Sequence, residues 1–263
     1  MSQELQQGVI VPIITPYRTS EILPLVDHIT SGGVPMIFLL GTTGESPWQT
    51  LKQKKELIQL TAPYIKKRAQ LLIGITGQTL KETMELMELA EEVGAFASVL
   101  AARALGPDCA FTIEKLLSAF TGNLLLYNYP DITSGQPIPL EHVFPFASEK
   151  RVLGIKDSSG NMDYFNALLT RRSFSFKVYY GPELNLETAL KKEIDGFVPG
   201  TGNLEPKLAC ELWEKKENGP WTAWNASKEA ILKKSPDYIT GLKLLLQERS
   251  LISDARRFEM RNA

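Results

Sequence analysis

LLLYNYP at residues 124–130 and VLGIKDS at residues 152–158 are apolar at almost every position before each run ends in polar residues. A strand with one wet face would alternate apolar and polar residues, so continuous runs predict strands that are covered on both faces, as in a parallel sheet. Six similar runs complete a set of expected strands. They are VIVPIIT (9–15), PMIFLLG (35–41), QLLIGI (70–75), ASVLAA (97–102), FKVYYG (176–181) and GFVPG (196–200).

Amphipathic segments separate these runs. LKQKKELIQLTAPYIKKR (51–68) and TLKETMELMELAEEVG (79–94) repeat apolar residues three and four positions apart with charged residues between them, which predicts helices with one buried face. Strand and helix therefore alternate along the chain. A series of such units predicts an α/β fold, a closed (β/α)8 TIM barrel rather than an open sheet.

The pattern changes near residue 218 and is wholly helical beyond it. Residues 221–234 and 237–252 predict two more helices, which are followed by a charged tail. We therefore expect a barrel over residues 1–218 and a C-terminal helical appendage over residues 219–263, packed on the barrel within one structural domain.

The charges of the chain are balanced. Its 263 residues carry 29 Lys plus Arg against 30 Asp plus Glu, a net charge of -1, so no overall field gathers nucleic acid. Small molecules are the expected partners. The charged tail contains Arg256, Arg257 and Arg261, for which a solvated helix face is expected and an anionic docking patch is the alternative.

The apolar segments favour no membrane role. The opening MSQELQQGVIVPIITP has no cationic segment followed by a long apolar stretch, so no signal peptide is expected. No apolar run reaches the roughly 20 residues that a membrane-spanning helix requires. These patterns predict a cytoplasmic protein.

Cysteine and histidine are too few and too scattered to indicate a metal centre. Cys109 and Cys210 lie far apart in helical patterns, which favours reduced core thiols over a disulfide. His28 and His142 have no neighbouring ligands at zinc spacing, and a Ser-His-Asp site loses support for the same reason. No metal site is expected.

The reactive groups of such barrels lie at the carboxyl ends of the strands, where Lys156 closes an apolar run. Burial of that amine would lower its pKa, and a neutral amine can attack a ketone to form a Schiff base that acts as an electron sink. The alternative is a lysine that extends to solvent at the strand end. Tyr127 ends the preceding run, where its phenol can transfer protons during Schiff-base formation or only pack at the rim.

A glycine-rich turn follows the second expected strand. Gly41-Thr42-Thr43-Gly44-Glu45-Ser46 offers two hydroxyls and backbone N–H groups, which can orient a small carboxylate. The turn lacks the lysine of a phosphate loop and the spacing of a dinucleotide site. Such turns also occur for backbone reasons alone.

Together these segments resemble the dihydrodipicolinate synthase and N-acetylneuraminate lyase superfamily, in order and over nearly the whole chain. Further matching positions are Pro12-Ile13-Ile14-Thr15-Pro16, Tyr180-Gly181, Asp195-Gly196-Phe197-Val198, Gly200 and Lys243.

The resemblance implies a role for each matching site residue. Lys156 would form a Schiff base with pyruvate or another 2-oxo acid, with Tyr127 as the acid and base. The resemblance implies neither a metal nor an organic cofactor. It implies a homotetramer, and a dimer is the alternative because the chain is short. The remaining implied roles are carboxylate binding by Gly41, Thr42 and Thr43, backbone contacts near Val198 and bracing of the turn by Glu45. Arg103, near the end of the fourth expected strand, is a candidate distal substrate contact with a solvent-facing arginine as the alternative, and Ser46 is a further candidate.

Departures from the family patterns indicate the subtype. Synthases carry a Pro-Tyr-Tyr segment where this chain reads AARALGP (101–107), and an arginine where it has Ile132. Sialic acid lyases usually have Val-Lys-Phe at the Schiff base and Ser-Thr in the turn, and neither occurs here. Ile155-Lys156-Asp157-Ser158-Ser159 with Tyr127-Asn128-Tyr129-Pro130 looks closest to the 2-keto-3-deoxygluconate aldolases.

The sequence therefore predicts a class I aldolase that joins pyruvate to an aldehyde and cleaves the product, most simply a 2-keto-3-deoxy sugar acid. One alternative is the dihydrodipicolinate synthase reaction between pyruvate and aspartate semialdehyde. A second alternative, from another class, is a non-catalytic barrel that binds a 2-oxo acid.

Overall fold

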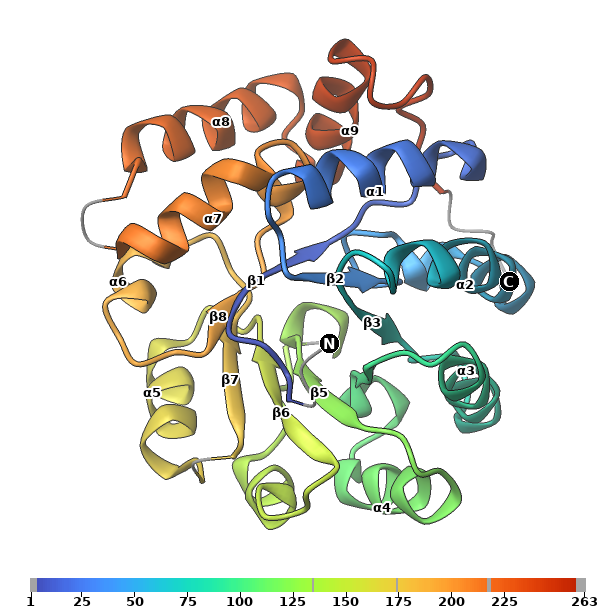
Figure 1. Cartoon of the computed structure of the whole chain (residues 1–263). Helices are drawn as coiled ribbons and strands as arrows, with labels where there is room; N and C mark the ends of the chain where they lie inside the picture. The colour runs from blue at the N-terminus through green and yellow to red at the C-terminus, as the bar shows by residue number, and fades with distance from the viewer. Residues whose placement is uncertain (1–3, 134, 174, 217–218, 259–263) are drawn as a thin grey trace. The chain divides into compact units, whose positions relative to one another are not determined.

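The computed structural model describes residues 4–133, 135–173, 175–216 and 219–258. Its parallel strands form a closed barrel in sequence order, β1 to β8, with helices between them (Figure 1), which confirms the predicted (β/α)8 barrel. The strands are β1 (Gly8–Pro12), β2 (Met36–Leu39), β3 (Gln70–Gly74), β4 (Ala97–Leu100), β5 (Leu124–Asn128), β6 (Val152–Asp157), β7 (Lys177–Tyr180) and β8 (Gly196–Phe197).

Each strand coincides with a predicted apolar run but ends earlier than the run does. In PMIFLLG the strand β2 ends at Leu39, because Leu40 turns into the left-handed region with φ 59°. Apolar residues continue beyond the strand since Leu40 is itself buried, at 3% exposure. Hydrophobicity therefore predicts burial at these ends better than it predicts strand geometry.

The helices follow the amphipathic segments, and polar caps set their starts. Thr50 accepts a hydrogen bond from the backbone N–H of Gln53, whose side chain accepts one from the backbone N–H of Thr50, so α2 begins at Leu51. The helices are α1 (Ile22–Ser31), α2 (Leu51–Ile65), α3 (Leu80–Glu92), α4 (Cys109–Ala119), α5 (Met162–Arg171), α6 (Leu186–Leu190), α7 (Pro206–Lys215), α8 (Trp221–Lys234) and α9 (Tyr238–Glu248). Short 3-10 helices occupy Thr19–Glu21, Ser46–Trp48, Ala102–Leu105, Pro130–Thr133, Leu140–His142, Phe144–Phe146 and Gly200–Asn203.

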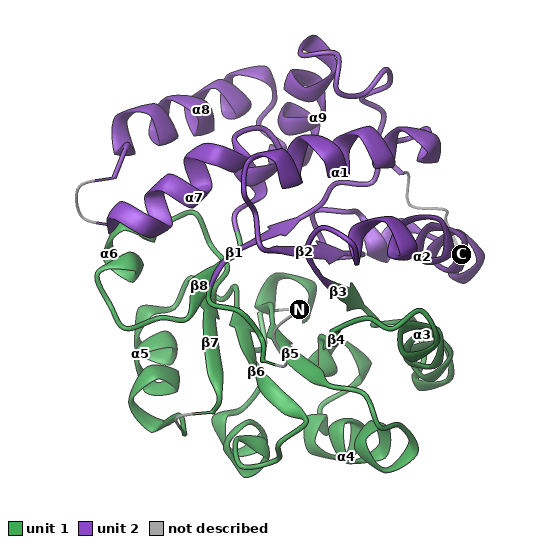
Figure 2. Ribbon diagram, viewed as in Figure 1, with its two compact units in different colours: residues 1–7, 72–198 green, residues 8–71, 199–263 purple. Residues whose placement is uncertain are grey.

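The chain divides into two compact units (Figure 2). Unit 1 comprises residues 1–7 and 72–198, and unit 2 comprises residues 8–71 and 199–263. The predicted division into a barrel to residue 218 and an appendage from residue 219 stays a prediction, and Asn218 lies outside the described residues.

Within unit 2, the two C-terminal helices bury apolar faces. Trp224 and Ile231 of α8 and Leu242 and Leu246 of α9 are buried, and α8 packs against α9. In the part of the chain that the structure describes, no helix is both long enough and apolar enough to cross a membrane.

The charged tail differs from its prediction. Between residues 249 and 258 the chain forms no helix, so the expected solvated helix face is wrong for Arg256 and Arg257. Ser250 adopts φ 59°, which ends helical geometry after α9 and turns the chain back over unit 2. Arg261 lies outside the described residues.

Within unit 1, the register of β5 and β6 positions the expected catalytic pair. Tyr127 lies opposite Lys156, and a register shift between Leu124 and Leu125 sets this pairing. On the other side of β6, Gly154 allows a close approach to β7, because it has φ 155° and a Cβ atom there would lie 2.0 Å from the carbonyl oxygen of Lys177. Any side chain at this position would push β6 and β7 apart.

Candidate active site

Lys156 is a buried amine on β6. Its exposed fraction is 4%, and burial lowers its pKa to about 7 because the ammonium loses its hydration. About half of the side chains are then neutral at pH 7, whereas an ordinary lysine near 10.4 is almost fully charged. The lowered pKa favours the neutral amine, and the role of Lys156 as a nucleophile stays a prediction.

Two tyrosines flank this amine in register. The Nζ atom lies 4.1 Å from the centroid of the Tyr127 ring on β5, and Tyr179 on β7 pairs with Lys156 on the other side. The hydroxyl of Tyr179 donates to the backbone carbonyl of Gln6 at 2.6 Å, and burial raises its pKa well above the ordinary value. The Tyr127 ring stacks on Tyr129, with centroids 5.7 Å apart and planes 5° apart. The structure thus places Lys156 and Tyr127 next to each other among aromatic rings.

A buried carboxylate, Asp157, lies next to the pair along the chain, and the sequence analysis assigned it no role of its own. Asp157 accepts hydrogen bonds from Asn128 Nδ2 at 2.7 Å, Ser159 Oγ at 3.0 Å and Ser159 N at 3.1 Å. Burial raises its pKa, and these hydrogen bonds offset part of the rise. The Asn128 Oδ1 atom accepts from the backbone N–H of Ile138 at 2.9 Å.

The Asn128–Asp157 contact ties the carboxyl ends of β5 and β6 together one residue beyond Tyr127 and Lys156. It limits how far the phenol and the amine can separate. In the sequence, the signal for this contact is that Asn128 and Asp157 directly follow Tyr127 and Lys156 at the ends of apolar runs.

Three other residues of interest lie in unit 1. Val198 is buried, and its backbone N–H donates to the carbonyl of Tyr180 at 2.8 Å. Arg103 lies in the 3-10 helix Ala102–Leu105 and donates through Nη1 to the carbonyl of Pro107 at 2.9 Å, which stabilises its own loop. Ile132, where the resemblance to synthases predicts an arginine, is 38% exposed. The contacts of Val198 and Arg103 with substrate stay predictions.

In unit 2, one tight turn gathers Gly41, Thr42, Thr43 and Ser46. The backbone N–H of Ser46 donates to the carbonyl of Gly41 at 3.3 Å, and that of Glu45 donates to the carbonyl of Thr42 at 2.9 Å. Thr42 and Thr43 are half-buried, whereas the residues on either side of them are buried. The turn therefore presents its two threonines while its ends are closed by backbone hydrogen bonds.

The next residues of the turn are held from two directions. The carbonyl of Gly44 accepts from Thr15 Oγ1 at 2.8 Å and from Gln49 Nε2 at 2.7 Å. A Cβ atom on Gly44 would lie 2.8 Å from the carbonyl oxygen of Ile13, so this position requires glycine.

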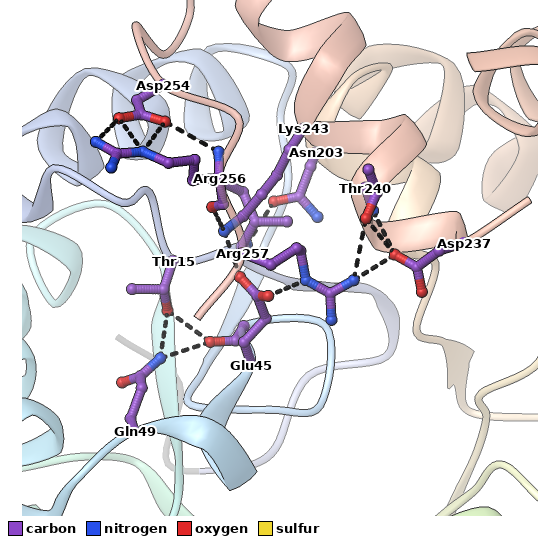
Figure 3. A network of polar contacts seen from close by, with 12 residues as sticks. Thr15, Glu45, Gln49, Asn203, Asp237, Thr240, Lys243, Asp254, Arg256 and Arg257 are labelled. Carbon is purple, nitrogen blue, oxygen red and sulfur yellow. Dashed lines mark hydrogen bonds and ion pairs between the residues drawn. The ribbon is translucent and has the colours of Figure 1, made fainter. Parts of the chain in front are cut away.

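A buried ionic cluster surrounds Glu45 (Figure 3). Lys243 Nζ donates to one carboxylate oxygen of Glu45 and Arg257 Nε donates to the other. The side chains of Glu45 and Lys243 have 0% exposure. Glu45 thus makes the bracing contacts that the sequence analysis expects of it, with a partner, Arg257, that the sequence analysis assigned elsewhere.

No group of three His, Cys, Asp or Glu side chains is placed to hold a metal ion among the residues that the structure describes. Both cysteines are free, and Cys109 is buried as a core thiol should be, whereas Cys210 is half-buried.

A closed parallel barrel with a buried lysine of lowered pKa beside a tyrosine ring defines a class of enzyme, the class I pyruvate-dependent aldolases and lyases. Comparison with known proteins agrees. The profile of the dihydrodipicolinate synthetase family matches residues 5–240, and the chain belongs to this family.

Relatives in this family carry two kinds of name. A 4-hydroxy-tetrahydrodipicolinate synthase of Herminiimonas arsenicoxydans is 29% identical over 222 residues, which cover 81% of this chain and 76% of the relative. A 2-dehydro-3-deoxy-D-gluconate/2-dehydro-3-deoxy-phosphogluconate aldolase of Picrophilus torridus is 30% identical over 199 residues, which cover 74% and 73%. The solved structure of dihydrodipicolinate synthase from Bacteroides thetaiotaomicron superposes with a TM-score of 0.84 at 27% identity, over 96% of this chain and 91% of that one. The chain is therefore an enzyme of this superfamily that acts on small molecules.

Proposed function

We propose that the enzyme reversibly cleaves a 2-keto-3-deoxy sugar acid to pyruvate and an aldehyde through a Schiff base at Lys156. The observation that carries this proposal is the buried amine with a pKa of about 7 whose Nζ lies 4.1 Å from the Tyr127 ring centroid. The relative of Picrophilus torridus, whose name is that of such an aldolase, supports the choice of substrate.

The proposed reaction begins when the neutral Lys156 amine attacks the C2 carbonyl of the sugar acid. Tyr127 donates a proton to the departing hydroxyl of the carbinolamine, so that water leaves and an iminium forms. The C3–C4 bond then breaks as the C4 hydroxyl loses its proton to the Tyr127 phenolate, and the electron pair moves into the iminium to give an enamine and an aldehyde. Protonation of the enamine at C3 and hydrolysis by water release pyruvate and restore the amine.

The substrate carboxylate must be held while this chemistry proceeds. We assign that role to Thr42 and Thr43, with Gly41 and the backbone near Val198 as further contacts and Arg103 and Ser46 as candidates for the distal part of the substrate. Half-buried hydroxyls on a closed turn fit a small anion, because they can donate hydrogen bonds at little cost in ordering.

The second candidate is condensation of pyruvate with aspartate semialdehyde, which similarity to a 4-hydroxy-tetrahydrodipicolinate synthase favours. The AARALGP segment supplies no phenol, and the exposed Ile132 supplies no guanidinium for the semialdehyde, and both weigh against this reaction. A non-catalytic barrel that binds a 2-oxo acid is the remaining alternative.

A trapping experiment tests the chemistry. The protein is incubated with pyruvate and borohydride, and peptides are examined by mass spectrometry, with a reduced pyruvate adduct expected on Lys156. Absence of the adduct would favour the non-catalytic barrel.

Rates of sugar acid cleavage and of condensation with aspartate semialdehyde then test the substrate. Faster condensation than cleavage would overturn the assignment. We also propose a cytoplasmic homotetramer, with a dimer as the alternative, and light scattering measures its mass.

A further inference from the structure

Glu45 occupies a backbone conformation that its side chain does not favour. Its φ of 59° and ψ of 26° lie in the left-handed region, which is uncommon for a residue with a Cβ atom. Its carboxylate is also fully buried. Both features cost free energy, so the surrounding contacts must stabilise this conformation.

Those contacts come from the C-terminal part of unit 2 (Figure 3). Lys243 on α9 and Arg257 on the segment beyond it each take one oxygen of the Glu45 carboxylate. Arg257 Nη1 also donates to Asp237, the N-cap of α9. Two acidic and two basic side chains thus balance one another in a region where an unbalanced charge would be costly.

Backbone contacts extend this attachment. Lys243 Nζ donates to the carbonyl of Arg256 at 2.9 Å, so one ammonium links the tail to Glu45. The carbonyl of Gly44 is fixed by Thr15 and Gln49. The turn is therefore held at two successive residues immediately after Thr43.

We propose that Glu45, Lys243 and Arg257 are positioning residues that hold Thr42 and Thr43 in the orientation needed to bind the substrate carboxylate. This inference rests on the proposed function, in which the two threonines bind that carboxylate. Glu45 is not a catalytic residue, because both of its oxygens already accept from cations and its side chain is inaccessible. The C-terminal segment thereby contributes to substrate affinity.

Arg256 and Arg257 provide a matched pair of variants. The Arg257 side chain is 26% exposed and pairs with Glu45, whereas the Arg256 side chain is 65% exposed and pairs with Asp254 two residues away. Arg256→Ala leaves its backbone carbonyl in place for Lys243. Arg257→Lys keeps the positive charge but not the guanidinium geometry, so it serves as the conservative rescue.

The first measurement is the pyruvate concentration that gives half-maximal borohydride trapping at Lys156. Arg257→Ala is expected to raise this concentration about tenfold, on the scale of one charge-assisted hydrogen bond, with the maximal extent of trapping unchanged. Arg256→Ala should change this concentration by less than about twofold, since an exposed charge contributes little. Arg257→Lys should give a concentration between those of the parent and Arg257→Ala. An unchanged half-maximal concentration in Arg257→Ala would overturn the inference.

The second measurement does not depend on the chemistry. Hydrogen exchange of the peptide that contains Thr42 to Ser46 is followed by mass spectrometry, with a peptide from β5 as the internal reference. Faster exchange of the turn in Arg257→Ala alone is expected. If even the parent protein forms no adduct, the proposed function fails by itself, and exchange decides whether Arg257 holds the turn. Equal exchange rates in all variants would show that Arg257 does not hold the turn.

Discussion

Lys156 and Lys243 are both buried, and they differ in what surrounds the ammonium. Lys156 in unit 1 is 4% exposed and Lys243 in unit 2 is 0% exposed, and burial lowers the pKa of both. At Lys243 the carboxylate of Glu45 offsets part of that effect. At Lys156 the Nζ atom lies over a neutral tyrosine ring, and the pKa falls to about 7.

The comparison separates burial from reactivity. Removing an amine from water disfavours its charge in both places, but only an adjacent carboxylate restores the charge. Lys243 is therefore suited to hold a turn as a cation, and Lys156 is suited to attack a carbonyl as a neutral amine. Each of the following experiments changes one side of this comparison.

The largest expected effect is on covalent reactivity. Lys156→Met should abolish the borohydride-trapped pyruvate adduct, a loss of at least about 10³-fold, because the nucleophile is removed. Lys243→Met should still form the adduct wherever it remains folded. Peptide mass spectrometry checks both, and an adduct on Lys243 in the parent protein would break the distinction between the two amines.

The second-largest expected effect is a loss of stability when Lys243 is replaced. Lys243→Met should lower the free energy of unfolding by about 3–5 kcal/mol, because it removes one partner of the buried Glu45 carboxylate. Lys156→Met should not lower it, since an apolar chain of similar volume replaces an amine that loses its hydration on folding. Urea unfolding measures both values. Equal losses would contradict the assignment of Lys243 as the structural cation.

The third effect concerns the phenol beside the reactive amine. Tyr127→Phe should reduce turnover about 10²-fold, because the proton donor for carbinolamine collapse is lost while the ring remains. Tyr179→Phe is the matched control, since its hydroxyl donates to the backbone of Gln6. It should cost about 1 kcal/mol of stability with little change in turnover. Steady-state kinetics would contradict the assignment if the two variants lost activity equally.

The smallest effect is the pH dependence of adduct formation. With a Lys156 pKa of about 7, the rate at limiting pyruvate should rise about tenfold from pH 6 to a plateau above the pKa, because only the neutral amine attacks. A rate that continues to rise toward pH 10 would show that Lys156 has the pKa of an ordinary lysine.

The same pKa predicts a pH dependence of stability. Between pH about 7 and about 10.5 the unfolded chain carries a proton on residue 156 that the folded chain lacks, so stability should increase with pH across that window. Urea unfolding at a series of pH values measures the increase. Lys156→Met should remove it, and an increase that persists in this variant would have to come from other groups.

The fold was predictable because its signals are local. Apolar runs marked the eight strands, and only their ends were misjudged, as at Leu40, where a buried side chain sits on a left-handed backbone. The expected pair of Lys156 and Tyr127 followed from a rule about strand ends, and β5 and β6 bring the two side chains together in register.

The contacts that the sequence analysis missed are those between distant positions. Asn128 and Asp157 meet only because of the register of two strands, and a shift at Leu124 sets that register. Arg257 is separated from Glu45 by 212 residues, so no local pattern could pair them, and the tail was interpreted as a solvated helix. Charge runs in a sequence say little about which acid each base will meet.

The contact between Glu45 and Arg257 also bears on how the protein is made. The 212 residues that separate them take roughly 10 to 40 s to synthesise at 5–20 residues per second. During that interval a nascent chain already holds both threonines but lacks the guanidinium that completes their support. A ribosome that stalls within α9 would therefore hold a polypeptide that contains Lys156, Thr42 and Thr43 but lacks Arg257, the proposed support of the turn.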